Sequence, residues 1–91
     1  MKIISSKTFE RDTRRLLKRN PQFIESVKET LVCLASDPFQ DRLKTHKLKG
    51  RLKDSWSCSV EYDLRIVFEF VMEENETVIL LHTIGSHDDV Y

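Results

Sequence analysis

The sequence WSCSVEYDLRIVFEF, residues 56–70, decides the fold class. Apolar residues recur at every second position in two runs, one made of Trp56, Cys58 and Val60, the other of Leu64, Ile66, Phe68 and Phe70. A period of two residues is typical of strands with one buried face. Tyr62-Asp63 separates the runs as a turn. The stretch predicts an antiparallel hairpin whose even-numbered side chains are buried and whose odd-numbered ones, Arg65 among them, lie on the other face.

Towards the C-terminus, a third β-rich run covers residues 77–83, after a polar turn at residues 73–76. Gly85 is expected to end this strand, and residues 86–91 to form a polar tail. Three consecutive strands joined by short turns predict an antiparallel meander.

Towards the N-terminus, the period changes to that of helices. Met1 to Ser5 is predicted as a strand, and Ser6 as the N-cap of a helix over residues 7–19. Asn20-Pro21 is expected to begin a second helix that ends near Ser36, before Asp37-Pro38. So short a connection predicts an antiparallel helical hairpin.

The predicted fold is therefore α+β, in the order β-α-α-β-β-β, with a helical hairpin packed on one face of a mostly antiparallel four-stranded sheet. The 91 residues are expected to form a single domain over 1–91. The longest apolar runs are too short to cross a bilayer, and the first residues lack the apolar segment of a signal peptide. The expected location is the cytoplasm, with no membrane partner.

The charge of the chain is divided unequally along its length. Residues 1–53 hold 14 Lys and Arg against 6 Asp and Glu, whereas residues 54–91 hold 1 against 9. No acid interrupts residues 42–53, which contain His46 and the cations Arg42, Lys44, Lys47, Lys49, Arg51 and Lys53. Such a cluster is either a solvated loop or a surface that binds phosphates, and the second interpretation is favoured.

Few other residues could perform chemistry. Cys33 and Cys58 have no CxxC spacing and are expected to be free buried thiols, with a disulfide or a metal pair as the alternative. The nucleotide-binding and metalloprotease motifs are absent, so no cofactor and no metal is expected. Arg65 is the single Lys or Arg after Lys53. Two roles remain open for it: a salt bridge to a carboxylate of Glu61, Asp63 or Glu69, or a clamp on a phosphate.

Three segments together resemble the RelE/ParE superfamily of toxin–antitoxin toxins, most closely its RelE, YafQ and YoeB branches. They are HKLKG at residues 46–50, YDLRIVF at 62–68, and the ending TIGSHDDVY at 83–91. The resemblance covers nearly the whole chain. It implies a metal-independent endoribonuclease, or mRNA interferase, that cleaves mRNA, often on the ribosome, by attack of the 2′-hydroxyl. It also implies a cognate antitoxin protein, with the toxin alone a monomer or part of a higher-order complex with the antitoxin.

By this resemblance, Arg65 matches the strand arginine that binds the phosphate, and His87 the histidine that transfers a proton. Tyr91 matches the terminal aromatic, Asp63 an acidic position before the strand, and His46 the histidine of the first segment. The RNA-binding residues would be Lys47, Lys49, Arg51 and Lys53.

The chain also departs from this resemblance. Its net charge is zero where relatives are usually basic, and Thr83 or His82 stands where YafQ-like proteins often carry an arginine. Two alternatives therefore stay open: a ParE-like inhibitor of DNA gyrase without enzymatic activity, and an inactive relative that binds only an antitoxin.

Overall fold

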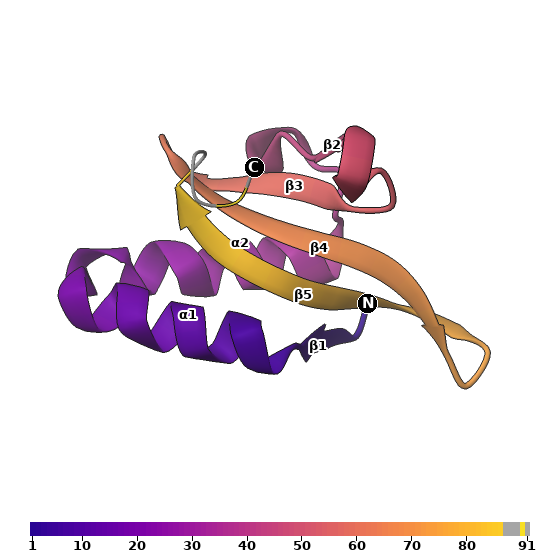
Figure 1. Ribbon diagram of the computed structural model, residues 1–91, viewed down its shortest axis with the longest axis horizontal. Coiled ribbons are helices and arrows are strands. Elements are labelled where there is room, and N and C mark those ends of the chain that lie inside the picture. Colours follow the sequence, from indigo (N-terminus) through magenta and orange to yellow (C-terminus); the bar gives the residue numbers. More distant parts are fainter. Residues whose placement is uncertain (87–89, 91) are drawn as a thin grey trace.

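Two helices lie against one face of a twisted sheet in the computed structural model of this chain (Figure 1), which describes residues 1–86 and 90 and, at Arg51, only the backbone. The order of the elements confirms the predicted fold class. It is β1 (Ile3–Ser5), α1 (Lys7–Arg19), α2 (Ile24–Ser36), β2 (His46–Lys47), β3 (Trp56–Glu61), β4 (Leu64–Glu73) and β5 (Glu76–Ser86). Among the described residues, no helix is both long and apolar enough to cross a membrane.

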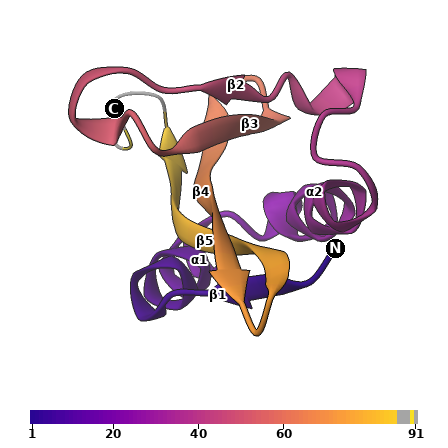
Figure 2. The same ribbon diagram turned by 90° about the vertical axis from the view of Figure 1, so that its right-hand side faces the viewer.

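The strands form one sheet in the order β1-β5-β4-β3-β2. β1 runs parallel to β5, and the other neighbours are antiparallel. The described residues therefore make five strands, one more than predicted, because His46 and Lys47 pair with β3 and extend its edge. Figure 2 shows how strongly the sheet twists, with β2 and β3 at its top and β1 and β5 at its bottom.

Both helices begin near the predicted residues, but one cap differs. The Ser6 hydroxyl accepts a hydrogen bond from the Phe9 amide at 3.0 Å, which confirms Ser6 as the N-cap of α1. Asn20, predicted to cap the second helix, instead closes the first: its amide nitrogen Nδ2 donates to the Leu16 carbonyl at 3.0 Å. A 3₁₀ turn over Pro21–Phe23 then leads into α2. Because the Asn20 side chain is used on α1, it makes no cap bond to this turn.

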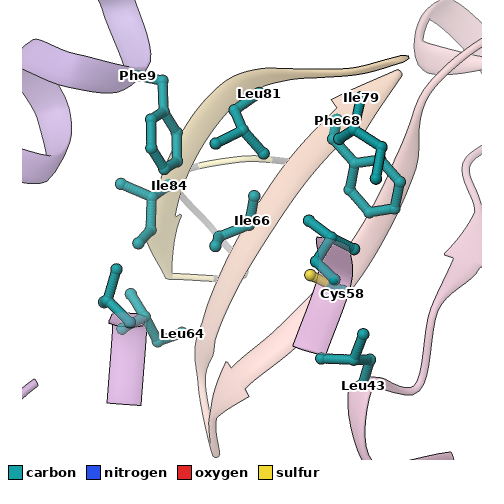
Figure 3. Packing of buried hydrophobic residues seen from close by; sticks show 11 residues of the cluster. Phe9, Leu43, Cys58, Leu64, Ile66, Phe68, Ile79, Leu81 and Ile84 are labelled. Carbon is teal, nitrogen blue, oxygen red and sulfur yellow. The ribbon is translucent and has the colours of Figure 1, made fainter. Parts of the chain in front are cut away.

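The core lies between the sheet and the helices. The even-numbered residues Cys58, Ile66 and Phe68 are fully buried and Leu64 nearly so, as predicted. Three others that were expected to be buried, Trp56, Val60 and Phe70, are only half-buried and pack against the margin of the core. Figure 3 shows these side chains converging with others from α1, β5 and the loop before β2; the wider cluster also contains Phe9, Val27, Leu34, Leu43, Ile79, Leu81 and Ile84. Arg65 points to the opposite face, because successive side chains of a strand alternate.

β5 does not end at Gly85, contrary to the prediction. It continues to Ser86, and Gly85 pairs with Arg65 while Ser86 pairs with Leu64. A register shift between Val67 and Phe68 leaves one extra residue, His82, on β5. This bulge changes the parity of the buried positions, from Ile79 and Leu81 before it to Ile84 after it. Gly85 is thus a residue of a continuous strand.

Candidate functional site

Arg65 lies in the middle of a row of paired residues that crosses the sheet. It pairs with Ser59 on β3 and with Gly85 on β5, on the face away from the helices. Ser86, next to Gly85, is the residue that precedes His87 in the chain. Ser86 pairs with Leu64, so the last described residue before His87 is one position away from the pair formed by Arg65 and Gly85.

The guanidinium of Arg65 is fixed by the turn between β3 and β4. Its Nη1 donates to the carbonyl oxygens of Glu61 at 3.1 Å and Tyr62 at 3.0 Å, and to the Ser59 hydroxyl at 3.3 Å. These acceptors are neutral, so they orient the guanidinium and leave its charge in place. The half-buried side chain is thus held in one orientation before any ligand binds.

Two of the carboxylates considered as salt-bridge partners for Arg65 bind other groups. Glu69 contacts Nε2 of His82, on the same face of the sheet, and both side chains are about one-third exposed (31% and 35%). Glu61 accepts a hydrogen bond from the Ser26 hydroxyl of α2. The structure therefore uses the Glu61 backbone, rather than its carboxylate, to hold Arg65.

The basic segment is split between the two faces of the sheet. His46 pairs with Ser57, whose other neighbour is Val67, so His46 shares the face of Arg65. From strand spacing and rise, their Cα atoms are about 12 Å apart. Lys47 pairs with Trp56 and therefore lies on the helix side. Lys47, one of the predicted RNA-binding residues, is therefore on the face opposite to Arg65, because neighbouring residues of a strand point to opposite faces.

The other predicted RNA-binding residues lie in the connection between β2 and β3. Lys49 and Lys53 are exposed on either side of a 3₁₀ turn over Gly50–Leu52, and Arg51 lies within it. The Leu48 amide donates a hydrogen bond to the Ser55 carbonyl at 2.9 Å, which closes this loop. Gly50 has a φ of +69°, a conformation that a residue with a side chain rarely adopts.

Asp63 is exposed in the β3–β4 turn beside Tyr62, which is 96% exposed. Both residues line a cavity of about 490 Å³ whose apolar floor includes Leu16, Phe23 and Leu64. His87 and Tyr91 lie outside the described residues. The structure thus describes three of the five predicted catalytic residues. Asp63 lies in the β3–β4 turn and Arg65 beside it, whereas His46 lies on the edge strand β2.

Two cations that the sequence did not single out lie near this end of β5. Arg15 and Arg19 of α1 line a second cavity, of about 330 Å³, together with Asp12, Thr83 and Gly85. Both cavities include Leu16, Asn20 and Gly85, so they adjoin. In the sequence, these arginines only indicate the solvent-exposed face of an amphipathic helix. Only the docking of α1 on β5 brings them to the end of the sheet.

Cys58 pairs with Ile66 and is fully buried on the helix side of β3. Burial raises the pKa of its thiol to about 12, although the backbone amide of Ile66 and the Arg65 guanidinium each oppose the shift. Cys58 is free and buried, as predicted, and it is protonated at neutral pH. Cys33 is also free, but it is only half-buried, contrary to the prediction. Within residues 1–86 and 90, no cluster of three or more His, Cys, Asp or Glu side chains could hold a metal ion.

The known proteins that resemble this chain in sequence or in fold include several bacterial toxins. A putative YafQ toxin from Haemophilus influenzae is 29% identical over 90 residues, which are 96% of this chain and 88% of that one. The Escherichia coli DinJ–YafQ complex contains a chain with a TM-score of 0.78 and 19% identity, covering 98% of this chain and 96% of that one. A metal-bound toxin from Helicobacter pylori has a TM-score of 0.72 and 30% identity, covering 100% and 99%.

The family model for YafQ, a bacterial toxin of type II toxin–antitoxin systems, matches residues 1–91, the whole of the sequence. The order of helices and strands agrees with that match, as does the fold of the E. coli YafQ chain. This chain therefore belongs to the YafQ family of type II toxin–antitoxin toxins.

Proposed function

We propose that this toxin is an endoribonuclease that cleaves mRNA, on the ribosome, by attack of the RNA's own 2′-hydroxyl and without a metal. The observation that carries the proposal is the preorganised guanidinium of Arg65. Its Nη1 is bound by turn carbonyls, one row from the point at which β5 leads into His87. A fixed guanidinium binds two phosphate oxygens with little further loss of freedom.

The chemistry requires three things of the protein. The 2′-oxygen loses its proton and attacks the phosphorus, the bond from phosphorus to the 5′-oxygen breaks, and that oxygen takes up a proton. A 2′,3′-cyclic phosphate remains, which water can open to a 3′-phosphate. Arg65 would hold the phosphate and offset the charge that develops on its oxygens.

His87 would transfer a proton, since imidazole titrates near neutral pH. Tyr91 would stack on a base or assist that transfer. Asp63 and His46 would act at the rim of the site, from the β3–β4 turn and from β2. Lys49, Arg51 and Lys53 would bind backbone phosphates from the loop between β2 and β3.

The antitoxin would be a protein that binds this chain and blocks access to RNA, in the cytoplasm. The family is defined by toxin–antitoxin systems, and the E. coli relative is seen in a complex with DinJ. Co-expression of this chain with the product of a short adjacent reading frame tests the pairing. Growth arrest by the toxin alone, relieved by a product that copurifies with it, is the expected result.

The activity itself is tested by cleavage of mRNA, with and without ribosomes, and by chemical identification of the new ends. Arg65→Ala and His87→Ala should each lose at least about 100-fold in rate, the scale of one charge-stabilising or acid–base group. Ser59→Ala is the matched control, because it removes one acceptor of Arg65 Nη1 and keeps the guanidinium. Full activity in both Arg65→Ala and His87→Ala contradicts the mechanism. Inhibition of DNA supercoiling with intact RNA would instead identify a gyrase inhibitor.

A further inference from the structure

Phe39 is an exposed aromatic residue held rigidly on the helix side of the sheet. Its side chain is 54% exposed, in the loop that joins α2 to β2. The Phe39 amide donates to Oδ1 of Asp37 at 3.0 Å. Around it, the Thr45 hydroxyl donates to the Pro38 carbonyl at 2.5 Å, and Gln40 Nε2 to the Cys33 carbonyl at 2.8 Å. The loop therefore fixes the position of the ring.

The ring of Phe39 contacts two other aromatic rings, those of Phe70 and Trp56. It stacks on Phe70 with ring centroids 5.8 Å apart and planes 24° apart. It also meets the edge of Trp56 at 5.2 Å and 80°. Trp56 and Phe70 are themselves in edge contact at 5.7 Å and pack against the core. Since Phe39 is 54% exposed despite these contacts, part of its ring is presented to solvent on a packed aromatic support.

Two lysines lie on β2 or in the loop that carries Phe39. Lys47 is the cross-strand partner of Trp56 and shares its face, and Lys44 precedes it in the same loop. Both lysines are exposed. The same loop also holds two acids, Asp37 and Asp41; Asp37 accepts the Phe39 amide and keeps its negative charge, while Arg42 pairs with Glu29 at 3.6 Å. We name Phe39, Trp56, Phe70, Lys44 and Lys47 the Phe39 platform.

We propose that the Phe39 platform binds single-stranded RNA outside the cleavage site, with a base stacked on Phe39 and phosphates bound by Lys44 and Lys47. An aromatic face rimmed by cations is the combination by which proteins hold unpaired nucleic acid. A purely apolar partner would leave both lysines unused. This inference rests on the proposed function, because it assumes that RNA is the substrate.

The position of the Phe39 platform extends the RNA path across an edge of the sheet. β2 is the edge strand, and its two residues point to opposite faces: His46 towards the face of Arg65, and Lys47 towards the platform. An RNA strand that passes over β2 would contact both faces. The single-stranded segment bound by the toxin would then be longer than the part that contacts Arg65.

Trp56, the single tryptophan of the chain, reports directly on this surface. We expect a 2′-O-methylated oligonucleotide of about 12 residues, within the usual footprint of single-strand-binding domains, to quench its fluorescence. The methyl group blocks the attacking oxygen, so binding is measured without cleavage. Phe39→Leu keeps an apolar side chain but removes the flat ring, and should weaken binding by about 5- to 150-fold. Replacing Lys47 with Met should reduce the salt dependence.

Two controls and two outcomes decide the matter. Phe39→Tyr should bind as the natural protein does, and so should Met72→Ala, which changes another exposed apolar side chain, 67% exposed. Unchanged affinity in Phe39→Leu overturns the inference. Equal quenching by polyglutamate at the same ionic strength also overturns it, because charge alone or a protein partner would then suffice. Cleavage that depends on Arg65 but not on Phe39 would contradict only the platform, and binding without cleavage only the proposed function.

Discussion

The two faces of strand β4 are built on different principles. On the helix side, Ile66 and Phe68 are fully buried among apolar side chains. On the other side, Arg65 and Glu69 are half-buried and each has a polar partner close by: turn carbonyls for Arg65, and His82 for Glu69. Apolar burial is non-directional, whereas hydrogen bonds fix orientation. One face therefore supplies stability and the other holds oriented polar groups.

The second face is not simply a solvated surface. Ser57 and Val67, which share the face of Arg65, are 0% and 2% exposed. A guanidinium placed beside such residues has restricted freedom of movement. The Arg65 side therefore combines a buried centre, which includes the apolar Val67, with oriented polar groups. Changes on the two faces should therefore differ in what they affect, stability on one and activity on the other.

The largest loss of stability is expected from Phe68→Ala. Phe68 is fully buried and touches the aromatic ring of Phe70 with centroids 5.5 Å apart. Truncation removes apolar burial and leaves a cavity, so the free energy of unfolding should fall by about 3–5 kcal/mol in a guanidinium titration. Val71→Ala, on the other face and half-buried, is the matched control and should cost far less. Similar losses in both variants would remove the distinction between the faces.

The helix side of the sheet is the dry face, and Cys58 allows it to be probed without a substitution. Its pKa is raised by burial from 9.0 to about 12, so its thiolate should be about 1000-fold scarcer in the folded protein. A thiol reagent at neutral pH should modify Cys33, which is partly exposed, well before Cys58. Since the folded state keeps this proton longer than the unfolded one, stability should fall as pH rises from about 9 to about 12. Cys58→Ala should lack that part of the pH dependence, and rapid labelling of Cys58 in the native protein would contradict a dry face.

The sequence predicted the dry face well because burial leaves a simple periodic mark. The alternation at residues 56–70 placed Cys58, Leu64, Ile66 and Phe68 correctly, and Ser6 was recognised as a cap. The match of the family over the whole chain also agrees with the resemblance of its three motifs.

The polar face was less predictable, since its geometry depends on contacts between distant residues. The bulge at His82 and the continuation of β5 through Gly85 follow from pairing with β4, which has no local signal. His46 and Lys47 lie on opposite faces of the sheet because β2 pairs with β3, and that pairing was not predicted. Arg15 and Arg19 reach the end of β5 only when α1 docks on the sheet. The partners of Arg65 were missed because backbone carbonyls carry no side-chain signature.

The smallest loss of stability, and the sharpest test of the comparison, is expected from Arg65→Met. Methionine keeps much of the length and removes the donor to the Glu61 and Tyr62 carbonyls. Those bonds are exposed, so water can replace the guanidinium, and unfolding should become easier by only about 1 kcal/mol. Cleavage of mRNA should nevertheless fall by at least about 100-fold, because water cannot replace a fixed charge at the phosphate. Denaturant titration and cleavage assays on one preparation measure both effects. A loss of more than about 3 kcal/mol would be the scale of a buried core residue. Arg65 would then be a structural residue of the turn, and both faces of β4 would contribute mainly to stability.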